Sequence, residues 1–475
     1  MAPPDLNALL RAGWDCESRG DFAGAEQRYR QVLDADPNHA PALNSLGSLA
    51  LLLNHPQPAA ALLERALARD PQNVDYQVNF GSALRMLRRF DEALLWARRA
   101  VALRPDFSAT HTLLAALLMD LHQMDDALAA CQRALQIDPK SLQALHALQA
   151  IHGMMLRPRE VIAAADRTLA LHPNDLHTHW NKARAALLVG DFKTGWTEWE
   201  WRTGFGNLHR DFPQPQWNHQ DLAGKTILLH CEGGAGDAIH FVRYLPLVRE
   251  RAGTVLLECP QALGELFRLM PDAPPVILRG QPLPAFDYHC SLSSLPLNFD
   301  TRLETIPAAV PYLRADPKKS AEFAARVGSE KLRVGLAWAG SPLPNDTRSR
   351  RLETFAPLFE VPGIRFFGLQ VGPDAAQCAP PVQDLSPHIH DFADLAAAMA
   401  NMDLVISVDT AVAHLAGALA KKVWTLITYV PDFRWMLDRA DSPWYPTMRL
   451  YRQTSRSDWR EPVAEMARDL AGSSR

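Results

Sequence analysis

A glycine-rich turn is the first place along the sequence where residue types and spacing suit chemistry. The apolar run Lys225–Cys231 is followed by Glu232-Gly233-Gly234-Ala235-Gly236-Asp237 and then by a helical pattern over 238–251. Glycines let a ligand approach the backbone closely, and the start of a helix offers N–H groups without partners. The turn is neither a Walker A loop nor a good dinucleotide fingerprint. An acidic residue at this position commonly caps a helix. Considered alone, Asp237 is therefore better explained as a helix cap than as a functional residue.

A second segment with suitable chemistry is Ser407–His414, between the expected strand Asp403–Val408 and the expected helix Val412–Leu419. The N–H groups and positive dipole end of that helix suit a phosphate or pyrophosphate. Asp409 could accept hydrogen bonds from sugar hydroxyls, and Thr410 could donate to a phosphate oxygen. His414 on the first helical turn could face the same site. The alternative, an Asp/Thr cap with a core histidine, is equally consistent with the sequence.

A third segment, Asn345–Arg351, follows the expected strand Leu332–Trp338 and holds Arg348, Arg350 and Arg351. The planar guanidinium fork suits phosphate oxygens because it can donate two parallel hydrogen bonds. A solvated loop explains the same residues, and the position after a strand end leaves the two interpretations balanced.

These segments lie within alternating strand and helix patterns, which predict parallel sheets covered on both faces. The two series are separated near Arg314–Glu330 and predict two lobes, with ligands at the carboxyl ends of the strands. The expected strands are Lys225–Cys231, Thr254–Cys259, Pro275–Leu278, Leu332–Trp338, Ile364–Gln370, Asp403–Val408 and Val423–Ile427. Phe286–Leu292 leads to a loop. The expected helices of the second series are Leu352–Glu360, Phe392–Asn401 and Val412–Leu419.

The first part of the sequence is periodic instead. Five prolines (Pro37, Pro71, Pro105, Pro139 and Pro173) are each 34 residues apart, and a small or β-branched residue precedes each by twelve positions. Proline ends a helix and small residues let paired helices approach closely, so each unit is predicted to be a helical hairpin. The pattern resembles the tetratricopeptide repeat over about 6–175, with a degenerate, tryptophan-containing capping unit that extends the array to 203. Such arrays bind peptides or proteins, or act as spacers.

Composition narrows the classes of function. The net charge of −4 argues against a bulk electrostatic grip on nucleic acid or anionic membrane. The six scattered cysteines include no CxxC pair and indicate reduced thiols rather than a zinc site. The N-terminus shows no signal peptide and no apolar run is long enough to span a membrane, so a cytoplasmic protein is expected.

The three segments occur in one order together with an aromatic tail that includes Pro431–Trp435, Asp441–Pro446 and Arg449–Gln453. This combination resembles bacterial tetratricopeptide-repeat proteins whose C-terminal domain is related to the ADP-heptose:lipopolysaccharide heptosyltransferases. The resemblance implies a GT-B fold of two Rossmann-like lobes, an acceptor-side lobe over 222–314 and a donor-side lobe over 331–465. It also implies a nucleotide-sugar donor as substrate, with no cofactor and no metal.

The resemblance also assigns roles to individual residues. Asp237 matches the proposed general base. The donor site is formed by Asp409, Thr410, Ala411, His414, Asn345, Arg348 and Arg350, and the acceptor-side loop by Glu232, Gly233, Gly234, Gly236 and His240. The sequence departs from the usual family loop at Gly233, where glutamine is common, and at Ala235, where leucine is usual.

Together these observations predict an inverting glycosyltransferase whose repeats hold a protein acceptor. The arrangement is similar to O-GlcNAc transferase and to flagellin glycosyltransferases. The alternatives are a non-catalytic scaffold with a degenerate transferase domain, a heptosyltransferase acting on a lipid-linked glycan, and another GT-B-like enzyme such as a sugar-nucleotide epimerase. The sequence leaves the sugar, the acceptor residue and the oligomeric state open.

Overall fold

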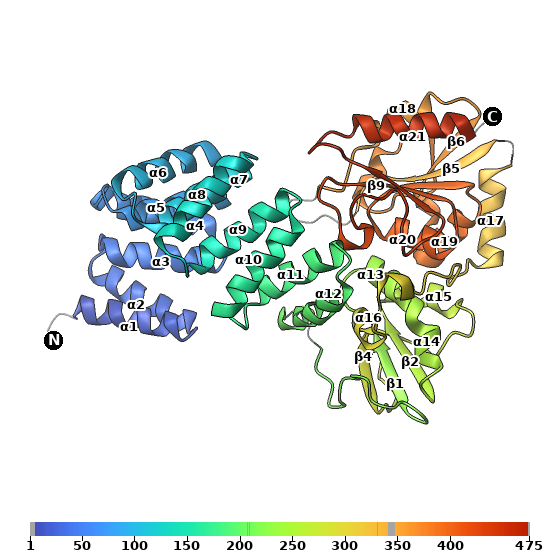
Figure 1. Ribbon diagram of the computed structural model, residues 1–475, viewed down its shortest axis with the longest axis horizontal. Coiled ribbons are helices and arrows are strands. Elements are labelled where there is room, and N and C mark those ends of the chain that lie inside the picture. The colour runs from blue at the N-terminus through green and yellow to red at the C-terminus, as the bar shows by residue number, and fades with distance from the viewer. Residues whose placement is uncertain (1–4, 207, 209, 330, 341–346, 474–475) are drawn as a thin grey trace. The chain divides into compact units, whose positions relative to one another are not determined.

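The structure is a computed structural model that describes residues 5–473 apart from 207, 209, 330 and 341–346. The chain divides into two compact units, Met1–Thr178 and His179–Arg475 (Figure 1). The first is built of helices and the second mainly of parallel sheets with helices, which confirms the predicted fold class.

The described part of the first unit consists of helical hairpins. Each first helix has 13 residues and each second helix 14, which accounts for the 34-residue period once the turns are added. The pairs are α1 (Leu6–Ser18) with α2 (Phe22–Ala35), α3 (Ala40–Leu52) with α4 (Pro56–Arg69), α5 (Val74–Met86) with α6 (Phe90–Leu103), α7 (Ser108–Asp120) with α8 (Met124–Ile137), and α9 (Leu142–Met154) with α10 (Pro158–Leu171).

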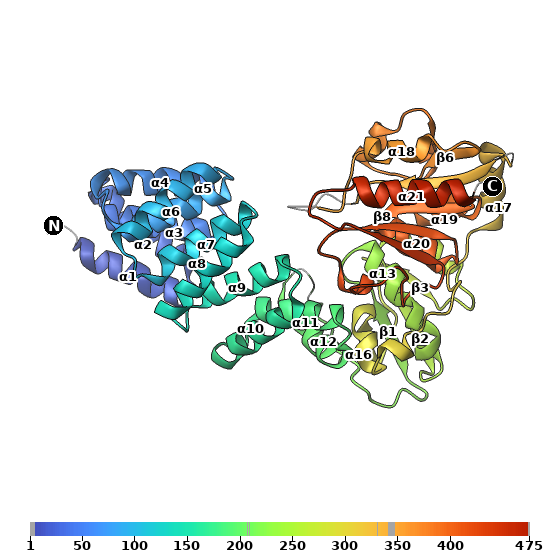
Figure 2. The same ribbon diagram turned by 45° about the horizontal axis from the view of Figure 1, so that its top comes forward.

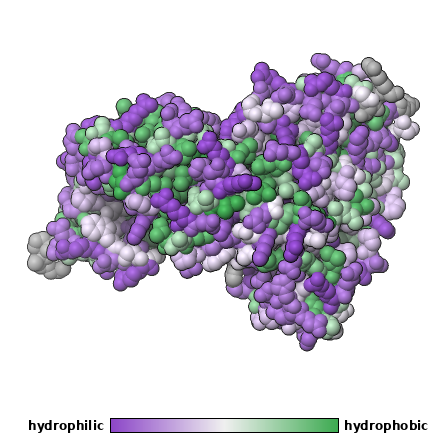
Figure 3. Space-filling model, in the orientation of Figure 1, coloured by the Kyte–Doolittle hydropathy of each residue, from purple (hydrophilic) through white to green (hydrophobic). Residues whose placement is uncertain are grey.

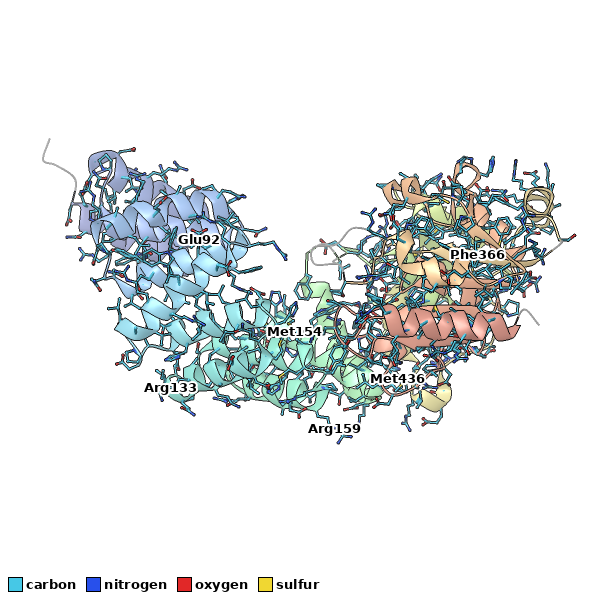
Figure 4. All side chains as sticks on the ribbon, turned by 90° about the horizontal axis from the view of Figure 1, so that it is seen from above. Glu92, Arg133, Met154, Arg159, Phe366 and Met436 are labelled. Carbon is cyan, nitrogen blue, oxygen red and sulfur yellow. The ribbon has the colours of Figure 1, made fainter. Side chains whose placement is uncertain are left out.

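Small residues set the spacing within each hairpin. A Cβ atom placed on Gly13 would lie 2.3 Å from Cε1 of Tyr29, and one on Gly47 would lie 2.7 Å from Cγ of Leu63. Larger side chains at these positions would force the paired helices apart. The first helices α3, α5, α7 and α9 also contact one another along the array. In contrast, Arg133 of α8 and Arg159 of α10, both exposed, lie at the outer edge of the ribbon (Figure 4).

A second 34-residue register, not anticipated from the sequence, lies in the turn inside each hairpin. One residue there always has a positive φ, between 54° and 85°. The residues are Gly20, Asn54, Arg88, His122, Leu156 and Gly190. The tight turn requires a left-handed residue, and the repeats supply it mostly without glycine, at some conformational cost. Gly190 extends this register to the hairpin α11 (Leu176–Leu188) and α12 (Phe192–Trp199), which therefore has repeat geometry.

The second unit contains two parallel sheets. The four-stranded sheet has the order β3 (Val276–Leu278), β2 (Thr254–Cys259), β1 (Thr226–His230), β4 (Tyr288–Ser291). The six-stranded sheet has the order β10 (Met448–Arg452), β9 (Val423–Ile427), β8 (Leu404–Val408), β5 (Leu332–Ala337), β6 (Ile364–Gly368), β7 (Val382–Asp384). Phe366 of β6, labelled in Figure 4, is 4% exposed, as expected for a parallel strand covered on both faces.

Several elements differ from the sequence-based expectation. The helical pattern over 238–251 forms α13 (Ala235–Phe241) and α14 (Leu245–Arg249), joined by a short 3₁₀ turn, and Pro246 lies in the first turn of α14. The expected helix Leu352–Glu360 is a 3₁₀ turn followed by α18 (Ala356–Phe359). The expected separator near Arg314–Glu330 contains α17 (Pro317–Val327). The strands β7 and β10 and the helix α21 (Arg460–Ser473) were not anticipated.

Helices cover the sheets and complete the core (Figure 2). The N-terminal lobe contains the four-stranded sheet, and its helices include α15 (Gln261–Arg268) and α16 (Leu295–Asn298). The C-terminal lobe contains the six-stranded sheet, and its helices include α19 (Phe392–Ala400) and α20 (Ala411–Ala418). Val463, Met466 and Leu470 of α21 pack with Trp424 and Tyr451 on one face of the larger sheet. None of the helices in the described ranges is long and apolar enough to span a membrane.

The hairpin α11–α12 packs against both lobes of the second unit. Trp196 of α12 is 2% exposed, and its ring centroid lies 6.2 Å from that of Phe241 in the N-terminal lobe and 5.7 Å from that of Phe433 in the C-terminal lobe. Edge-to-face aromatic contacts of this kind stabilise a core beyond simple burial. The sequence grouped residues 179–203 with the repeats, whereas the division between the compact units precedes His179. This last hairpin is therefore a structural part of the α/β unit.

We expect Trp196→Ala to destabilise the α/β unit by about 3–5 kcal/mol, because it removes a fully buried aromatic side chain. Differential scanning calorimetry of the full chain measures this as a lower transition temperature. Trp14→Ala is the matched control, since Trp14 is 48% exposed on α1. An equal shift in both variants would contradict the placement of α12 in the core.

Candidate active site

The segments with suitable chemistry meet where the two lobes touch. The glycine-rich turn connects β1 to α13, and Asp409 connects β8 to α20. These two helices pack against each other through Gly236, where an added Cβ atom would lie 3.2 Å from Cδ2 of His414 and 3.5 Å from Cα of Ala411. Two strand-end segments from different lobes are thus brought together as the topology of parallel sheets predicts.

Asp237 carries contacts from both lobes. Its Oδ2 accepts a hydrogen bond from the backbone N–H of Gly234 at 3.1 Å, so the capping interaction suggested by the sequence is present. Its Oδ1 forms an ion pair with Nη2 of Arg434 at 2.5 Å. The Asp237 side chain remains 38% exposed. Capping therefore does not prevent this carboxylate from meeting a substrate.

The conformation of the turn explains why glycine occupies position 233. Gly233 has a φ of +68°, and a Cβ atom there would lie 2.8 Å from Oδ2 of Asp237. Any other residue would be strained in its backbone and would press on the carboxylate. The departure from the usual family residue is thus matched to a particular loop shape in this chain.

Arg434 is the central cation of the site, and sequence reasoning did not single it out. Its side chain is 7% exposed, and Nη1 pairs with Oδ1 of Asp432 at 2.9 Å. The guanidinium carbon lies 4.5 Å from the ring centroid of Phe433 and 5.3 Å from that of Phe241. Desolvation opposes the charge, but Asp432 and Asp237 outweigh it, so the pKa of Arg434 is raised. Its position after the expected strand Val423–Ile427 was the available signal, because β9 neighbours β8.

Asp409 and Asp432 are two carboxyls with different electrostatic surroundings. Burial, and then the charge of Asp432, raise the pKa of Asp409 to about 6 against the opposing effects of Trp435, Arg348 and Arg434. Desolvation also acts on Asp432, but the charges of Arg434 and Arg184 outweigh it and lower the pKa. Environments that separate the pKa values of neighbouring carboxyls are typical of functional sites.

Thr410 bonds to the N–H groups in the first turn of α20. The hydroxyl oxygen of Thr410 accepts from the N–H of Val412 at 3.3 Å, and its carbonyl accepts from Ala413 at 3.1 Å and His414 at 3.4 Å. Gly236 of the other lobe packs against Ala411. The N–H groups of Val412, Ala413 and His414 therefore all have a partner on Thr410.

His414 and His240 lie in the contact between the lobes, not on an accessible surface. Nδ1 of each ring is within hydrogen-bonding distance of the Tyr445 hydroxyl, at 2.9 Å for His414 and 3.1 Å for His240. Burial, with nearby arginine charges, lowers the pKa of both histidines well below the usual value. Both imidazoles are therefore neutral and buried, with the Tyr445 hydroxyl as a shared partner. The buried Arg243 completes the cluster by donating to the carbonyl of Trp444 at 2.6 Å.

The arginine-rich segment separates into different environments. Nη1 of Arg348 donates to the carbonyl of Asp409 at 3.4 Å, which places this guanidinium at the site. Arg350 lies over the ring of Trp459, 4.8 Å from its centroid, and donates to the carbonyl of Arg348. Arg351 pairs with Glu353 at 3.1 Å on an exposed surface. Asn345, also expected at the donor site, lies outside the described residues.

Glu232 anchors the glycine-rich turn through a buried ion pair. It forms a buried ion pair with Arg202, whose Nη1 also pairs with Glu200 at 2.7 Å and whose Nη2 donates to Ser294 at 2.7 Å. Since a buried arginine is stable only when its donors are satisfied, this network holds the turn in one conformation. Its contacts are those of a structural residue.

Comparison with known families agrees with this architecture. Residues 18–85 match the tetratricopeptide repeat family, and residues 375–462 match glycosyltransferase family 9 (heptosyltransferase). The second match includes β8, Asp409, α20 and the Asp432–Arg434 segment. The chain thus contains one segment that matches tetratricopeptide repeats and another that matches glycosyltransferase family 9.

Individual proteins are similar to parts of this chain. Protein FlbA of Caulobacter vibrioides is 30% identical over 336 residues, which cover 61% of this chain and 55% of FlbA. The chain thus spans about half the length of this curated relative. Among solved structures, a thermophilic tetratricopeptide protein of Thermus thermophilus matches with a TM-score of 0.36 and 23% identity, over 38% of this chain and 99% of that one. PilF of Pseudomonas aeruginosa matches with a TM-score of 0.35 and 18% identity, over 42% and 91%.

We expect Gly233→Ala to destabilise the α/β unit by about 1–2 kcal/mol, the typical penalty for a left-handed alanine. It should also displace the Asp237 carboxylate. Gly234→Ala is the matched control, because Gly234 has a φ of −85° and its added Cβ would lie 3.7 Å from Oδ2 of Asp237. Urea denaturation of both variants compares the two positions, and equal midpoints would contradict the described turn.

Asp409→Asn is expected to stabilise the chain by roughly 1–3 kcal/mol at pH 7.5. The raised pKa means that folded Asp409 keeps its proton between about pH 4 and 6 while the unfolded chain has released it. Stability is therefore lost as pH rises through this window, and asparagine avoids the loss. The advantage should vanish near pH 4, as followed by urea denaturation at both pH values.

Asp403→Asn supplies a control of opposite sign at the other end of β8. Asp403 pairs with Arg333 at 2.7 Å, and this arginine lowers its pKa. Its contribution to stability exists at neutral pH and is lost on acidification, so this variant should be less stable at pH 7.5. If Asp409→Asn were also less stable than wild type at pH 7.5, the raised pKa of Asp409 would be contradicted.

Proposed function

We propose that this protein is a glycosyltransferase that moves a sugar from a nucleotide-sugar donor to a protein acceptor held by the repeats. The transfer inverts the anomeric configuration and needs no metal. The observation that carries this proposal is the position of Asp237. One partly exposed carboxylate from the N-terminal lobe faces Arg434 and the Asp409 segment, both within the part that matches glycosyltransferase family 9.

The reaction assigned to this site begins at Asp237. Each carboxylate oxygen has two acceptor positions, so Asp237 can bind an acceptor hydroxyl while it keeps its contacts with Gly234 and Arg434. As general base it takes the hydroxyl proton while the oxygen attacks the anomeric carbon. The bond from that carbon to the donor phosphate breaks on the opposite face, its electron pair stays with the leaving diphosphate, and the configuration inverts.

The C-terminal lobe supplies the groups for the donor. Arg348 is the cation at the strand-end edge that suits the leaving diphosphate, because it already lies beside Asp409. Arg350 is held by Trp459 and by the carbonyl of Arg348, so it supports the loop in this mechanism. In this proposal Asp409 accepts hydrogen bonds from sugar hydroxyls.

The repeats supply the acceptor specificity in this proposal. Large apolar side chains remain exposed on their first helices, at Trp14 (48%), Leu52 (61%) and Met86 (38%). Hydrophobic residues also gather in patches on the visible face of this unit (Figure 3). Exposed apolar surface of this kind favours a protein partner over a small polar acceptor. A flagellin-like protein is one acceptor consistent with the architecture, and a cytoplasmic location would give access to nucleotide sugars.

The test uses the full chain in buffer containing EDTA. We expect calorimetry to detect binding of at least one nucleotide sugar, and intact-mass analysis of a protein captured from lysate to show a hexose- or heptose-sized addition. Asp237→Asn should lower kcat by about 10²–10⁴-fold, the usual contribution of a general base. Asp287→Asn is the control, because Asp287 is 44% exposed and accepts a backbone N–H at the opposite end of the same sheet.

The outcomes separate the alternatives. An Asp237→Asn variant that transfers sugar at the wild-type rate excludes the general-base assignment. A chain that binds no nucleotide but still captures a partner favours the non-catalytic scaffold. Addition to a lipid-linked glycan rather than to a protein would assign the acceptor to the heptosyltransferase class.

A further inference from the structure

We propose that Arg434 is a positioning residue that orients the Asp237 carboxylate, and does so only while the two lobes are in contact. The inference rests on the proposed function, since it concerns the base of that reaction. Asp237 belongs to α13 of the N-terminal lobe, whereas Arg434 follows β9 of the C-terminal lobe. Their ion pair of 2.5 Å therefore joins the lobes at the reacting group.

Contacts within the C-terminal lobe hold one end of the Arg434 side chain in position. Oδ1 of Asp432 accepts from Nη1 of Arg434 at 2.9 Å and from its backbone N–H at 3.1 Å. One end of the guanidinium fork is thus held within its own lobe, and the other end, Nη2, is directed at Asp237. A planar fork held at one end directs its second donor with little freedom.

Aromatic rings from both lobes enclose this guanidinium. Phe433 comes from the same lobe as Arg434, and Phe241 comes from α13, which also carries Asp237. Trp196 of α12 contacts both rings. Separation of the lobes would remove Phe241 and Asp237 from Arg434 together, so orientation of the base depends on lobe contact.

Burial divides the roles of the two partners. The side chain of Arg434 is 7% exposed and that of Asp237 is 38% exposed. The arginine is thus a buried support, and the carboxylate is the group that a substrate can reach. Loss of the fork should then reduce turnover and leave donor affinity unchanged, because a small misplacement of a reacting group lowers the rate steeply.

The first experiment compares Arg434→Lys with wild type. Lysine keeps the charge but cannot donate to Asp432 and Asp237 through one planar group. We expect kcat to fall by about 10²-fold, while the dissociation constant of the donor nucleotide, measured by calorimetry, stays the same. Arg449→Lys is the control, because Arg449 pairs with Glu465 at 2.9 Å on an exposed surface of the same lobe. Weaker donor binding with unchanged kcat would overturn the proposal and make Arg434 a donor ligand.

A double-mutant cycle tests whether Arg434 acts through Asp237. In an Asp237→Asn background the Arg434→Lys change should cause no further loss of kcat, since residues that act as a unit are not additive. A multiplied loss would indicate a general structural role and overturn the inference. Asp432→Asn is a milder second variant that loosens the anchor of Arg434, and its effect should show the same dependence on Asp237.

Failure of this inference differs from failure of the proposed function. If the wild-type chain transfers sugar and Arg434→Lys keeps its kcat, only the positioning role is excluded. If wild type neither binds a nucleotide sugar nor modifies a partner, the proposed function is excluded.

Discussion

The close contact of α13 with α20 is the constraint on which the site depends. Gly236 permits this contact because it has no side chain. An added Cβ atom there would lie 3.2 Å from Cδ2 of His414 and 3.5 Å from Cα of Ala411. With the helices this close, Asp237 on one lobe comes within ion-pair distance of Arg434 on the other. Asp409 also lies within electrostatic reach of Arg434. A separation of even one side-chain layer would leave isolated strand-end residues on two lobes.

This contact places charged groups in a poorly solvated region, where an unpaired charge is strongly unfavourable. Two features reduce this cost: the buried arginines have bonding partners, and the buried histidines are neutral. Arg434 is balanced by Asp432 and Asp237, while Arg243 is surrounded by aromatic rings and bonded to the Trp444 carbonyl and the Tyr312 hydroxyl. His240 and His414 stay neutral because burial and nearby arginines lower their pKa. One continuous apolar cluster then runs from α12 through both lobes.

The same cluster explains why α11 and α12 pack with the sheets although they keep the turn geometry of a repeat. The preceding repeats bury small residues such as Ala25 and Ala59 between paired helices. The last hairpin keeps a small residue at the equivalent position, Gly195, and adds the large rings of Trp196 and Trp199, which pack against aromatic partners. Phe433 and Trp444 from the C-terminal lobe supply them. These tryptophans therefore join a hairpin of repeat geometry to the core of the α/β unit.

The sequence by itself determined the repeats, the parallel sheets and the strand-end positions of Asp237 and Asp409. These features follow from local periodicity and from the turn that must come after a strand. The tertiary structure decided which of those residues share a site. It paired Asp237 with Arg434, buried His414 against Tyr445, bonded the N–H of Val412 to Thr410, and put Arg348 rather than Arg350 beside Asp409. These outcomes depend on contacts between distant segments, which local spacing does not encode.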